Sequence, residues 1–164
     1  MGRLDTPKGI DIAVDVCEIL SKKYNIRWYV LGEGAQRSFL EEMIKEKGLE
    51  DKFILLGAKI NPYSYLSKCN IYVQPSRFEG KSIALEEAKS FRKPIVTTCF
   101  TTVKDQIEDG VTGLISEIDA RSIAEKIERI LVDESFGEKL SENLSDYKGN
   151  EDEINVFYSL LETK

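Results

Sequence analysis

Short apolar runs alternate with helical patterns along nearly the whole chain of 164 residues. Five runs have strand character, because they are short, rich in β-branched or aromatic residues, and bounded by Gly, Pro or polar residues. They span residues 26–32, 51–57, 70–76, 93–98 and 112–117. Nearly continuous apolarity within a strand is typical of a parallel sheet covered on both faces. The alternation therefore predicts an α/β fold with a doubly wound parallel sheet, in which ligands bind beyond the carboxyl ends of the strands.

Two segments between or after the strands have clear helical signatures. In the first, apolar residues recur at spacings of three and four from Ile10 to Leu20. We expect Thr6 to cap this helix and Pro7 to occupy its first turn. The helix after the last strand should begin at the N-cap Asp119, with Ile118 and Ile123 forming a hydrophobic staple. Its predicted inner face comprises Ile123, Ile127, Ile130 and Leu131.

Composition excludes several function classes. The chain has 29 acidic and 23 basic residues and a net charge of -6, so no overall positive field favours nucleic acid or an anionic membrane. No apolar run approaches the roughly 18 residues that a membrane span requires. The three cysteines, Cys17, Cys69 and Cys99, lie in apolar neighbourhoods and are expected to be buried thiols in a reducing compartment. We therefore expect a cytoplasmic domain without a membrane span.

Histidine is absent from the sequence. Its absence removes Ser/His/Asp and Cys/His triads and most catalytic zinc sites. Any chemistry must then rely on carboxylates, cations and backbone amides. We expect no metal and no cofactor.

The first candidate site lies at the start of the first helix. Lys8 opposes the helix dipole there, and Gly9 costs about 1 kcal/mol relative to alanine. A bound anion would explain both, since it would draw on the dipole, the amides and the ammonium together. Arg3, five residues earlier, could supply a second cation. Alternatively, Lys8 and Arg3 are solvated surface cations and the glycine is accidental.

The second candidate site lies between the third and fourth predicted strands, in residues 75–96. The chain turns at Glu79 and Gly80 and enters a helix at about Ser82. Gly80 would let a ligand approach the backbone, and the amides of Lys81, Ser82 and Ile83 would donate to an anion. Carboxylates beside an anion site suit a ligand that also carries hydroxyl groups, because an ionised carboxylate only accepts hydrogen bonds. That combination describes a sugar nucleotide; alternatively, Glu79 complements the helix dipole and Glu87 is a solvated helical residue.

Together the motifs resemble glycosyltransferase family 4, the retaining GT-B enzymes also called group 1 glycosyltransferases. The resemblance covers nearly the whole chain, and it rests on the order and spacing of the motifs rather than on any single one. They are "GRL" and "KG" near the start, "LGEG" (31–34), "PS" and "EG" around 75–80, the pair Glu79 and Glu87, "KPIV" (93–96) and "DGVTGLI" (109–115). Lys81 departs from the pattern, because family members usually carry an aromatic or aliphatic residue there.

The resemblance implies roles for individual residues. Arg3 and Lys8 would grip the donor diphosphate, Glu79 would hydrogen-bond hydroxyls of the transferred sugar, and Glu87 would hold the ribose. Catalysis would then rest on Glu79, Arg3 and Lys8. Further donor contacts are implied for the amides of Gly80, Lys81 and Ser82, and the loop from Gly57 to Ile60 would lie near the base.

The resemblance also implies an organisation and a function. Residues 1–149 would form the Rossmann-like donor-binding half of a GT-B enzyme, here without its N-terminal acceptor domain and most of its first strand. Residues 150–164 would form a helix that crosses to that missing half. The full enzyme would transfer a sugar from a nucleoside-diphosphate sugar, such as a UDP-sugar, with retention, in polysaccharide or glycoconjugate synthesis. It would be cytoplasmic or peripheral at the membrane, and the isolated domain would be inactive.

Four alternatives differ in what they require. A GT-B sugar-nucleotide epimerase would act on the donor alone, and a non-catalytic nucleotide-sugar-binding module would bind it without transfer. A dinucleotide-binding loop at residues 31–37 lacks the third glycine, because Arg37 stands in its place. A phosphoacceptor receiver domain would need an acidic pair at the end of its first strand, and none is found there.

Overall fold

The structure is a computed structural model that describes residues 1–149. The helix predicted for 150–164 lies outside the described residues. Five short strands confirm the five predicted runs, each within its predicted bounds: β1 (Trp28–Leu31), β2 (Phe53–Gly57), β3 (Tyr72–Gln74), β4 (Ile95–Thr98) and β5 (Leu114–Ser116). Six α-helices are described: α1 (Ile10–Ser21), α2 (Arg37–Glu46), α3 (Tyr63–Leu66), α4 (Ile83–Ser90), α5 (Ala120–Val132) and α6 (Glu134–Glu142). Two 3-10 turns, η1 (Thr6–Lys8) and η2 (Val103–Asp105), complete the order.

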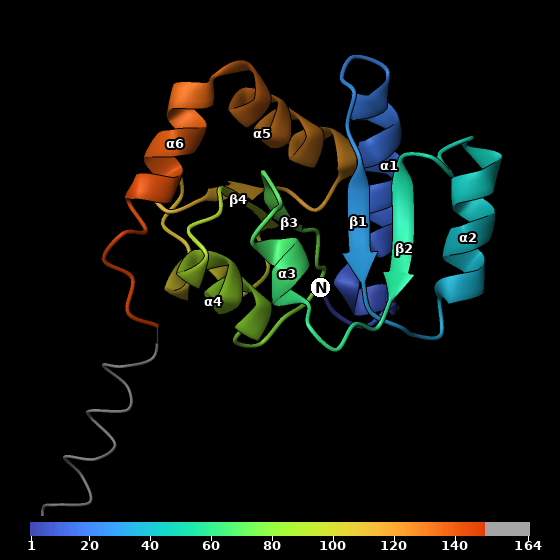
Figure 1. Ribbon diagram of the computed structural model, residues 1–164, viewed down its shortest axis with the longest axis horizontal. Helices are drawn as coiled ribbons and strands as arrows, with labels where there is room; N and C mark the ends of the chain where they lie inside the picture. The colour runs from blue at the N-terminus through green and yellow to red at the C-terminus, as the bar shows by residue number, and fades with distance from the viewer. Residues whose placement is uncertain (150–164) are drawn as a thin grey trace, which may run out of the picture.

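All strand pairs are parallel, as predicted, but they form two sheets instead of one. One sheet pairs β1 with β2, and the other has the order β3-β4-β5. The two sheets lie on either side of a gap between β1 and β3 in the ribbon view (Figure 1). Periodicity alone predicts parallel strands but does not say whether neighbouring strands complete a single ladder.

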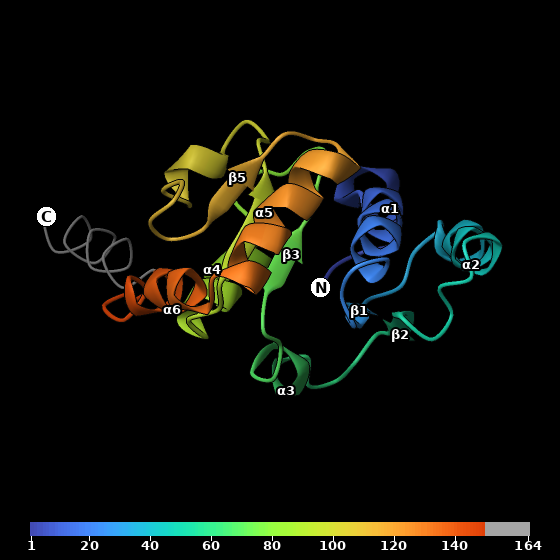
Figure 2. The same ribbon diagram turned by 90° about the horizontal axis from the view of Figure 1, so that it is seen from above.

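Helix α1 joins the two sheets through two apolar stripes. Ile12, Val16 and Leu20 are buried in a cluster with the inner residues of α5 and with Val96 of β4. Ala13, Val14 and Cys17 are buried in a second cluster with β1, β2 and α2. A third cluster packs α3 and α4 against β3 and β4. Figure 2 shows α1 and α5 side by side, in agreement with the buried cluster that they share.

The predicted helix starts are partly confirmed. Asp119 caps α5, since its carboxylate accepts from the amides of Arg121 and Ser122. The first helix begins differently: Asp5, not Thr6, precedes the 3-10 turn η1, and α1 starts only at Ile10. Gly9 separates the two in the left-handed conformation, with φ 63°, which ends the turn and redirects the chain.

Two burial predictions need correction. Cys17 is buried, but Cys69 is only half-buried and Cys99 is exposed, because Cys99 follows β4 where the chain leaves the sheet. On α5, Ile123, Ile127 and Ile130 are buried as predicted. Leu131 is 38% exposed, because it lies beside the gap between the sheets.

Candidate functional site

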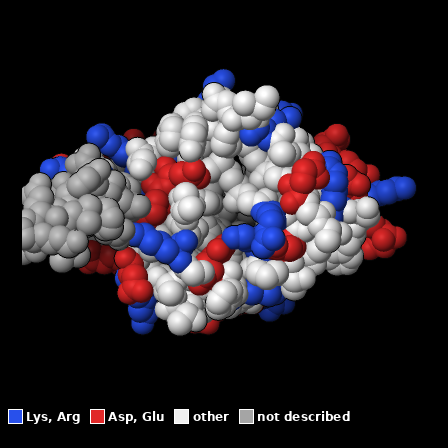
Figure 3. All heavy atoms as spheres, turned by 90° about the horizontal axis from the view of Figure 1, so that it is seen from below, with Lys and Arg blue, Asp and Glu red and all other residues white. Residues whose placement is uncertain are grey.

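The residues singled out from the sequence gather at the carboxyl ends of the strands. The segment before α1 and the loop between β3 and α4 meet there, at the lower edge of Figure 1. Figure 3 shows this face hollowed near its centre, with basic and acidic side chains in contact at the edge of the hollow. This is the location at which doubly wound α/β domains bind ligands.

The N-terminal segment is fixed by backbone contacts on both sides. The amides of Gly2 and Leu4 donate to the carbonyls of Leu31 and Glu33, each at 2.9 Å, so residues 2–4 lie alongside the carboxyl end of β1. Further on, a Cβ atom at Gly9 would lie 2.0 Å from the carbonyl oxygen of Pro75. Only glycine lets the turn at residue 9 approach the β3–α4 loop this closely. The glycine therefore has a structural reason, which does not require a bound anion.

Lys8 and Glu79, 71 residues apart in sequence, form the central contact of the site. The Lys8 ammonium donates to both Glu79 carboxylate oxygens, at 2.8 and 2.9 Å. The Glu79 side chain is 11% exposed and that of Lys8 28% exposed, so solvent screens the pair only partly. An ammonium has three N–H donors. Two donate to Glu79, which leaves one that can point to a ligand anion.

Three further residues, to which the sequence pattern assigns no role, hold Glu79 and the following residue in place. Ser76 donates its hydroxyl to Glu79 Oε1 at 2.7 Å, and Gln74 donates its amide nitrogen to the same oxygen at 3.3 Å. Thr102 donates its hydroxyl to the Gly80 carbonyl at 2.7 Å. A signal for Gln74 existed, because a buried polar residue in an apolar strand needs a hydrogen-bonding partner.

An ion pair behind the site ties α1 to the loop that carries Glu79. Arg77 donates to both carboxylate oxygens of Asp11, at 2.8 and 2.6 Å, while its backbone amide donates to Pro7. Partial desolvation raises the pKa of Asp11, but the hydrogen bond and charge of Arg77 outweigh it and hold this pKa below its usual value. The bidentate geometry fixes the relative position of the Lys8 turn and the Glu79 loop.

We expect Asp11→Asn to lower the free energy of unfolding by about 1 kcal/mol at pH 7, because the side chains are 25% and 35% exposed and solvent weakens the pair. A carboxyl whose folded pKa is depressed contributes stability above its unfolded pKa, which is lost as the pH falls through the folded pKa. The deficit of the variant should therefore shrink below about pH 4, the unfolded value for aspartate. Urea denaturation at pH 7 and at pH 3 measures this.

The matched control is Asp51→Asn, an exposed aspartate at the start of the β2 segment. Its effect should stay within about 0.5 kcal/mol at both pH values. A deficit of Asp11→Asn that is the same at both pH values would contradict the role given to the ion pair.

Glu87 lies on α4 and accepts a hydrogen bond from the Tyr63 hydroxyl at 3.0 Å. This hydrogen bond to a carboxylate raises the pKa of Tyr63. Glu79, Glu87 and Lys8 all lie close enough to the Met1 amino group to influence its pKa. Desolvation also raises the pKa of buried Tyr72, with smaller contributions from Glu87 and Glu79. The structure therefore brings both predicted carboxylates to one region.

The groups predicted to donate to an anion at the start of α4 are only partly accessible to a ligand. The amide of Ser82 donates to the Gln106 side chain at 2.9 Å, and the Ser82 hydroxyl donates to Gln74 at 2.9 Å. Ser82 is thus a buried structural residue, contrary to the prediction of an open donor. Gly80 faces open space, since a Cβ there would meet no atom within 4 Å, and Ile83 is exposed. Lys81 is exposed at the same turn.

The remaining predicted residues lie at the edge of the site. The Arg3 side chain is 81% exposed and pairs with Asp5 at 3.2 Å, so Asp5 offsets part of its charge. Gly57 ends β2 at φ 75° above the Glu33 carboxylate, and Ile60 projects fully into solvent from the following loop.

Within the described part of the chain, no group of three or more His, Cys, Asp and Glu residues is arranged to hold a metal ion. None of the helices described for residues 1–149 is long and apolar enough to cross a membrane.

Comparison with known proteins gives a consistent result. The family model described as "Glycosyl transferases group 1" matches residues 1–148. Alpha-D-kanosaminyltransferase of Streptomyces kanamyceticus is 29% identical over 147 residues, which cover 87% of this chain and 38% of the relative. The capsular polysaccharide biosynthesis glycosyltransferase CapM of Staphylococcus aureus is 31% identical over 146 residues, which cover 87% of this chain and 38% of CapM. The chain thus spans less than half the length of these relatives.

The structure of a TarM variant from S. aureus, in complex with fondaparinux, alpha-GlcNAc-glycerol and UDP, superposes with a TM-score of 0.86. The two chains are 26% identical, and the match covers 99% of this chain and 34% of TarM. The parallel strands and the location of the site at their carboxyl ends agree with the family match over residues 1–148. The chain therefore belongs to the group 1 glycosyltransferase family and has the Rossmann-like fold found in GT-B glycosyltransferases.

Proposed function

We propose that this chain is the donor-binding domain of a retaining glycosyltransferase and that its ligand is a nucleoside-diphosphate sugar. One observation carries the proposal: a lysine, whose side chain donates only to Glu79 among residues 1–149, and that partly buried glutamate meet at the carboxyl ends of the strands. A cation suits the diphosphate, and a carboxylate suits sugar hydroxyls. A ligand that carries both groups matches the pair.

The residues would act mainly by positioning and by electrostatics. The remaining Lys8 donor would stabilise the negative charge that develops on the departing diphosphate, and Arg3 would add a second, mobile cation from the edge. Ser76 and Gln74 donate to Oε1 of Glu79, whereas Oε2 accepts from Lys8 and would use its second lone pair to accept from a sugar hydroxyl. Glu87 would accept from the ribose in place of the Tyr63 hydroxyl that it now binds.

The amides of Gly80 and Lys81 would face the sugar phosphate, and the loop from Gly57 to Ile60 would lie near the base. No metal is needed for these contacts.

The nucleotide and the pathway are proposed from similarity. TarM, which shares this fold at 26% identity, has UDP in its complex, and we propose UDP as the nucleotide. CapM acts in capsular polysaccharide biosynthesis, which favours a role in polysaccharide or glycoconjugate synthesis. The relatives are more than twice as long as the matched region. We therefore propose that an acceptor-binding domain completes the active enzyme, closes over the donor and excludes water, and that this chain alone does not transfer sugar.

The two glutamates provide the test. Glu79→Gln should weaken binding of a UDP-sugar about tenfold while changing UDP binding less than threefold, because a charge-assisted hydrogen bond to a sugar hydroxyl is worth about 1.5 kcal/mol. Glu87→Gln should weaken both ligands to the same extent, because both contain the ribose. Isothermal titration calorimetry with UDP and with a UDP-sugar measures the four affinities.

The control is Glu125→Gln, an exposed glutamate on α5. It should leave both affinities unchanged. If Glu79→Gln weakened UDP and the UDP-sugar equally, the assignment of Glu79 to the sugar would be wrong.

A further inference from the structure

Gln106 is a buried polar residue to which neither the sequence pattern nor the proposed function gives a role. It follows the 3-10 turn η2 and is 7% exposed. Its chain neighbours Val103 and Ile107 are buried apolar residues. An amide in these surroundings carries a desolvation cost that hydrogen bonds must offset. Its hydrogen bonds therefore show which part of the structure it holds in place.

The Gln106 side chain pairs with both backbone groups of Ser82, the residue that caps α4. Its oxygen accepts from the Ser82 amide at 2.9 Å, and its nitrogen donates to the Ser82 carbonyl at 3.0 Å. The same nitrogen donates to the Glu86 carboxylate at 2.6 Å. An ionised carboxylate accepts but cannot donate, and Glu86 also accepts from Lys89 at 3.4 Å. The direction of the Gln106 amide is thereby fixed.

From Ser82, the hydrogen bonds continue to Glu79. The Ser82 hydroxyl donates to the side-chain oxygen of Gln74 at 2.9 Å. Because the Gln74 oxygen accepts there, its nitrogen is turned toward Glu79 and donates to Oε1 at 3.3 Å. The linked residues form a continuous chain of hydrogen bonds, the polar chain, with a carboxylate at each end: Glu86, Gln106, Ser82, Gln74 and Glu79.

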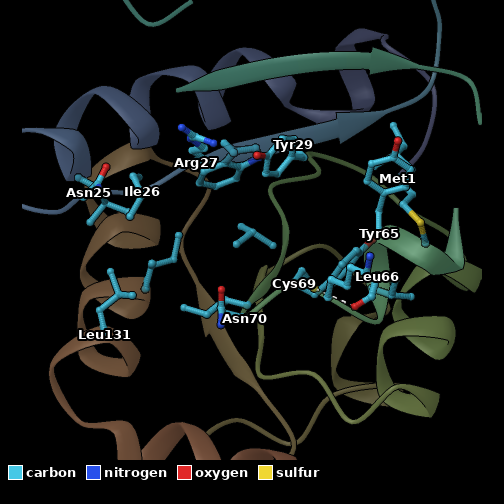
Figure 4. A pocket seen from close by; sticks show the side chains of 18 residues that line it. Met1, Asn25, Ile26, Arg27, Tyr29, Tyr65, Leu66, Cys69, Asn70 and Leu131 are labelled. Atoms are coloured by element: carbon cyan, nitrogen blue, oxygen red, sulfur yellow. Dashed lines mark hydrogen bonds between the residues drawn. The ribbon is translucent and has the colours of Figure 1, made fainter. Parts of the chain in front are cut away.

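Tyr72 supports the same orientation of Gln74 from within β3. Tyr72 is among the residues that line the pocket between the two sheets, which Figure 4 shows with Tyr29 on one side and Asn70 on the other. It is only 6% exposed, so its hydroxyl needs a partner in the protein, and it donates to the Gln74 oxygen at 3.3 Å. A reversed Gln74 amide would lose this donor and would place its oxygen against the Glu79 carboxylate, which only accepts.

The segment that carries Gln106 holds the chain just after Glu79 at two points. Thr102, before η2, donates its hydroxyl to the Gly80 carbonyl at 2.7 Å. Gln106, after η2, holds Ser82 through both backbone groups. The position of the turn that carries Glu79 therefore depends on a segment that follows β4.

We propose that Gln106 is a positioning residue for sugar recognition, which acts on Glu79 through the polar chain without touching the ligand. The chain keeps an N–H donor on Oε1 of Glu79, so that Oε2 stays directed at Lys8 and at a sugar hydroxyl. This role rests on the proposed function, in which Glu79 binds the transferred sugar. A change at Gln106 should therefore affect binding of a nucleoside-diphosphate sugar more than binding of the bare nucleoside diphosphate.

The first test needs no ligand. Gln106→Met keeps the length of the side chain but removes its hydrogen bonds, so the side-chain amide resonances of Gln74 should shift in the NMR spectrum of the free chain; Gln74→Met identifies these resonances. The control Thr112→Val removes a hydrogen bond to the Glu108 amide, at 2.9 Å, from the loop that follows Gln106. It should leave the Gln74 resonances in place. Unmoved Gln74 resonances in Gln106→Met would overturn the proposal.

The second test measures binding by calorimetry with UDP and UDP-GlcNAc as probes, since the TarM complex contains UDP and alpha-GlcNAc-glycerol. Gln106→Met should weaken UDP-GlcNAc binding about fivefold and UDP binding less than about twofold, because a hydrogen bond to the sugar is misplaced while the diphosphate contacts remain. Thr112→Val should change neither affinity. Equal weakening of both probes by Gln106→Met would show a general structural effect and would overturn the positioning role.

Ser82→Ala tests the same chain one link closer to Glu79, should Gln106→Met not fold. It removes the hydroxyl that reaches Gln74 but keeps the backbone groups that Gln106 binds. It should also weaken UDP-GlcNAc more than UDP, and it should add nothing to the effect of Gln74→Met, because both changes act on one contact. An unchanged ratio of the two affinities, or effects that multiply in the double variant, would overturn the proposal.

Two outcomes separate this inference from the proposed function. If Glu79→Gln changes the relative affinity for UDP-GlcNAc and UDP but Gln106→Met does not, Gln106 has no positioning role. If Gln106→Met shifts the Gln74 resonances but neither it nor Glu79→Gln changes the relative affinity, the role of Glu79 in sugar binding is wrong, and the positioning role falls with it.

Discussion

Gly9→Ala is expected to lower the free energy of unfolding by about 3 kcal/mol or more, the largest stability change among the variants considered. A left-handed conformation costs alanine about 1 kcal/mol, and a Cβ at this position would lie 2.0 Å from the Pro75 carbonyl oxygen. The atoms that this Cβ would meet most closely, O and C of the Pro75 carbonyl, are backbone atoms and cannot rotate away. Relief of the clash therefore requires the Lys8 turn and the Glu79 loop to separate. Thermal and urea denaturation measure the loss.

Gly48→Ala separates the two causes. Gly48 has nearly the same φ, 62°, but a Cβ there meets no atom within 4 Å. Its cost should therefore be only about 1 kcal/mol. Equal losses for the two variants would show that the close approach of Gly9 to Pro75 does not matter.

Much of the fold could be predicted because its signals are local. Each strand is a short apolar run between turn residues, and Asp119 precedes its helix with the usual capping geometry. The division into two sheets could not be predicted, because the pairing of β1 with β3 or with an intervening strand depends on neighbours distant in sequence. The exposure of Cys99 could not be predicted either: its chain neighbours Thr98 and Phe100 are buried, but Cys99 itself is exposed.

In the candidate site, too, local signals can be found from the sequence, whereas contacts between distant residues cannot. Lys8 and Gly9 can be found from the sequence because they violate helix preferences, and the structure explains both within the chain: Lys8 pairs with Glu79, and Gly9 packs on Pro75. The supporting contacts could not be found from local patterns. Arg77 and Asp11 are 66 residues apart, and the Ser82 amide is occupied by a side chain 24 residues away.

Lys8→Ala is expected to have the largest effect on ligand binding. Loss of a charge-assisted contact to the diphosphate should weaken UDP binding about 10- to 100-fold, equivalent to roughly 1.5 to 3 kcal/mol. The same variant should lower the free energy of unfolding by only about 1 kcal/mol, because Ser76 and Gln74 still donate to the Glu79 carboxylate.

The most direct test is therefore a calorimetric titration of UDP into the 164-residue chain in excess chelator, repeated with Lys8→Ala and with the exposed control Lys45→Ala. We predict that the unmodified chain and Lys45→Ala bind UDP equally without a divalent metal and that Lys8→Ala binds at least tenfold more weakly. Equal affinity of all three proteins, or binding that disappears in chelator, would contradict a diphosphate site built on Lys8.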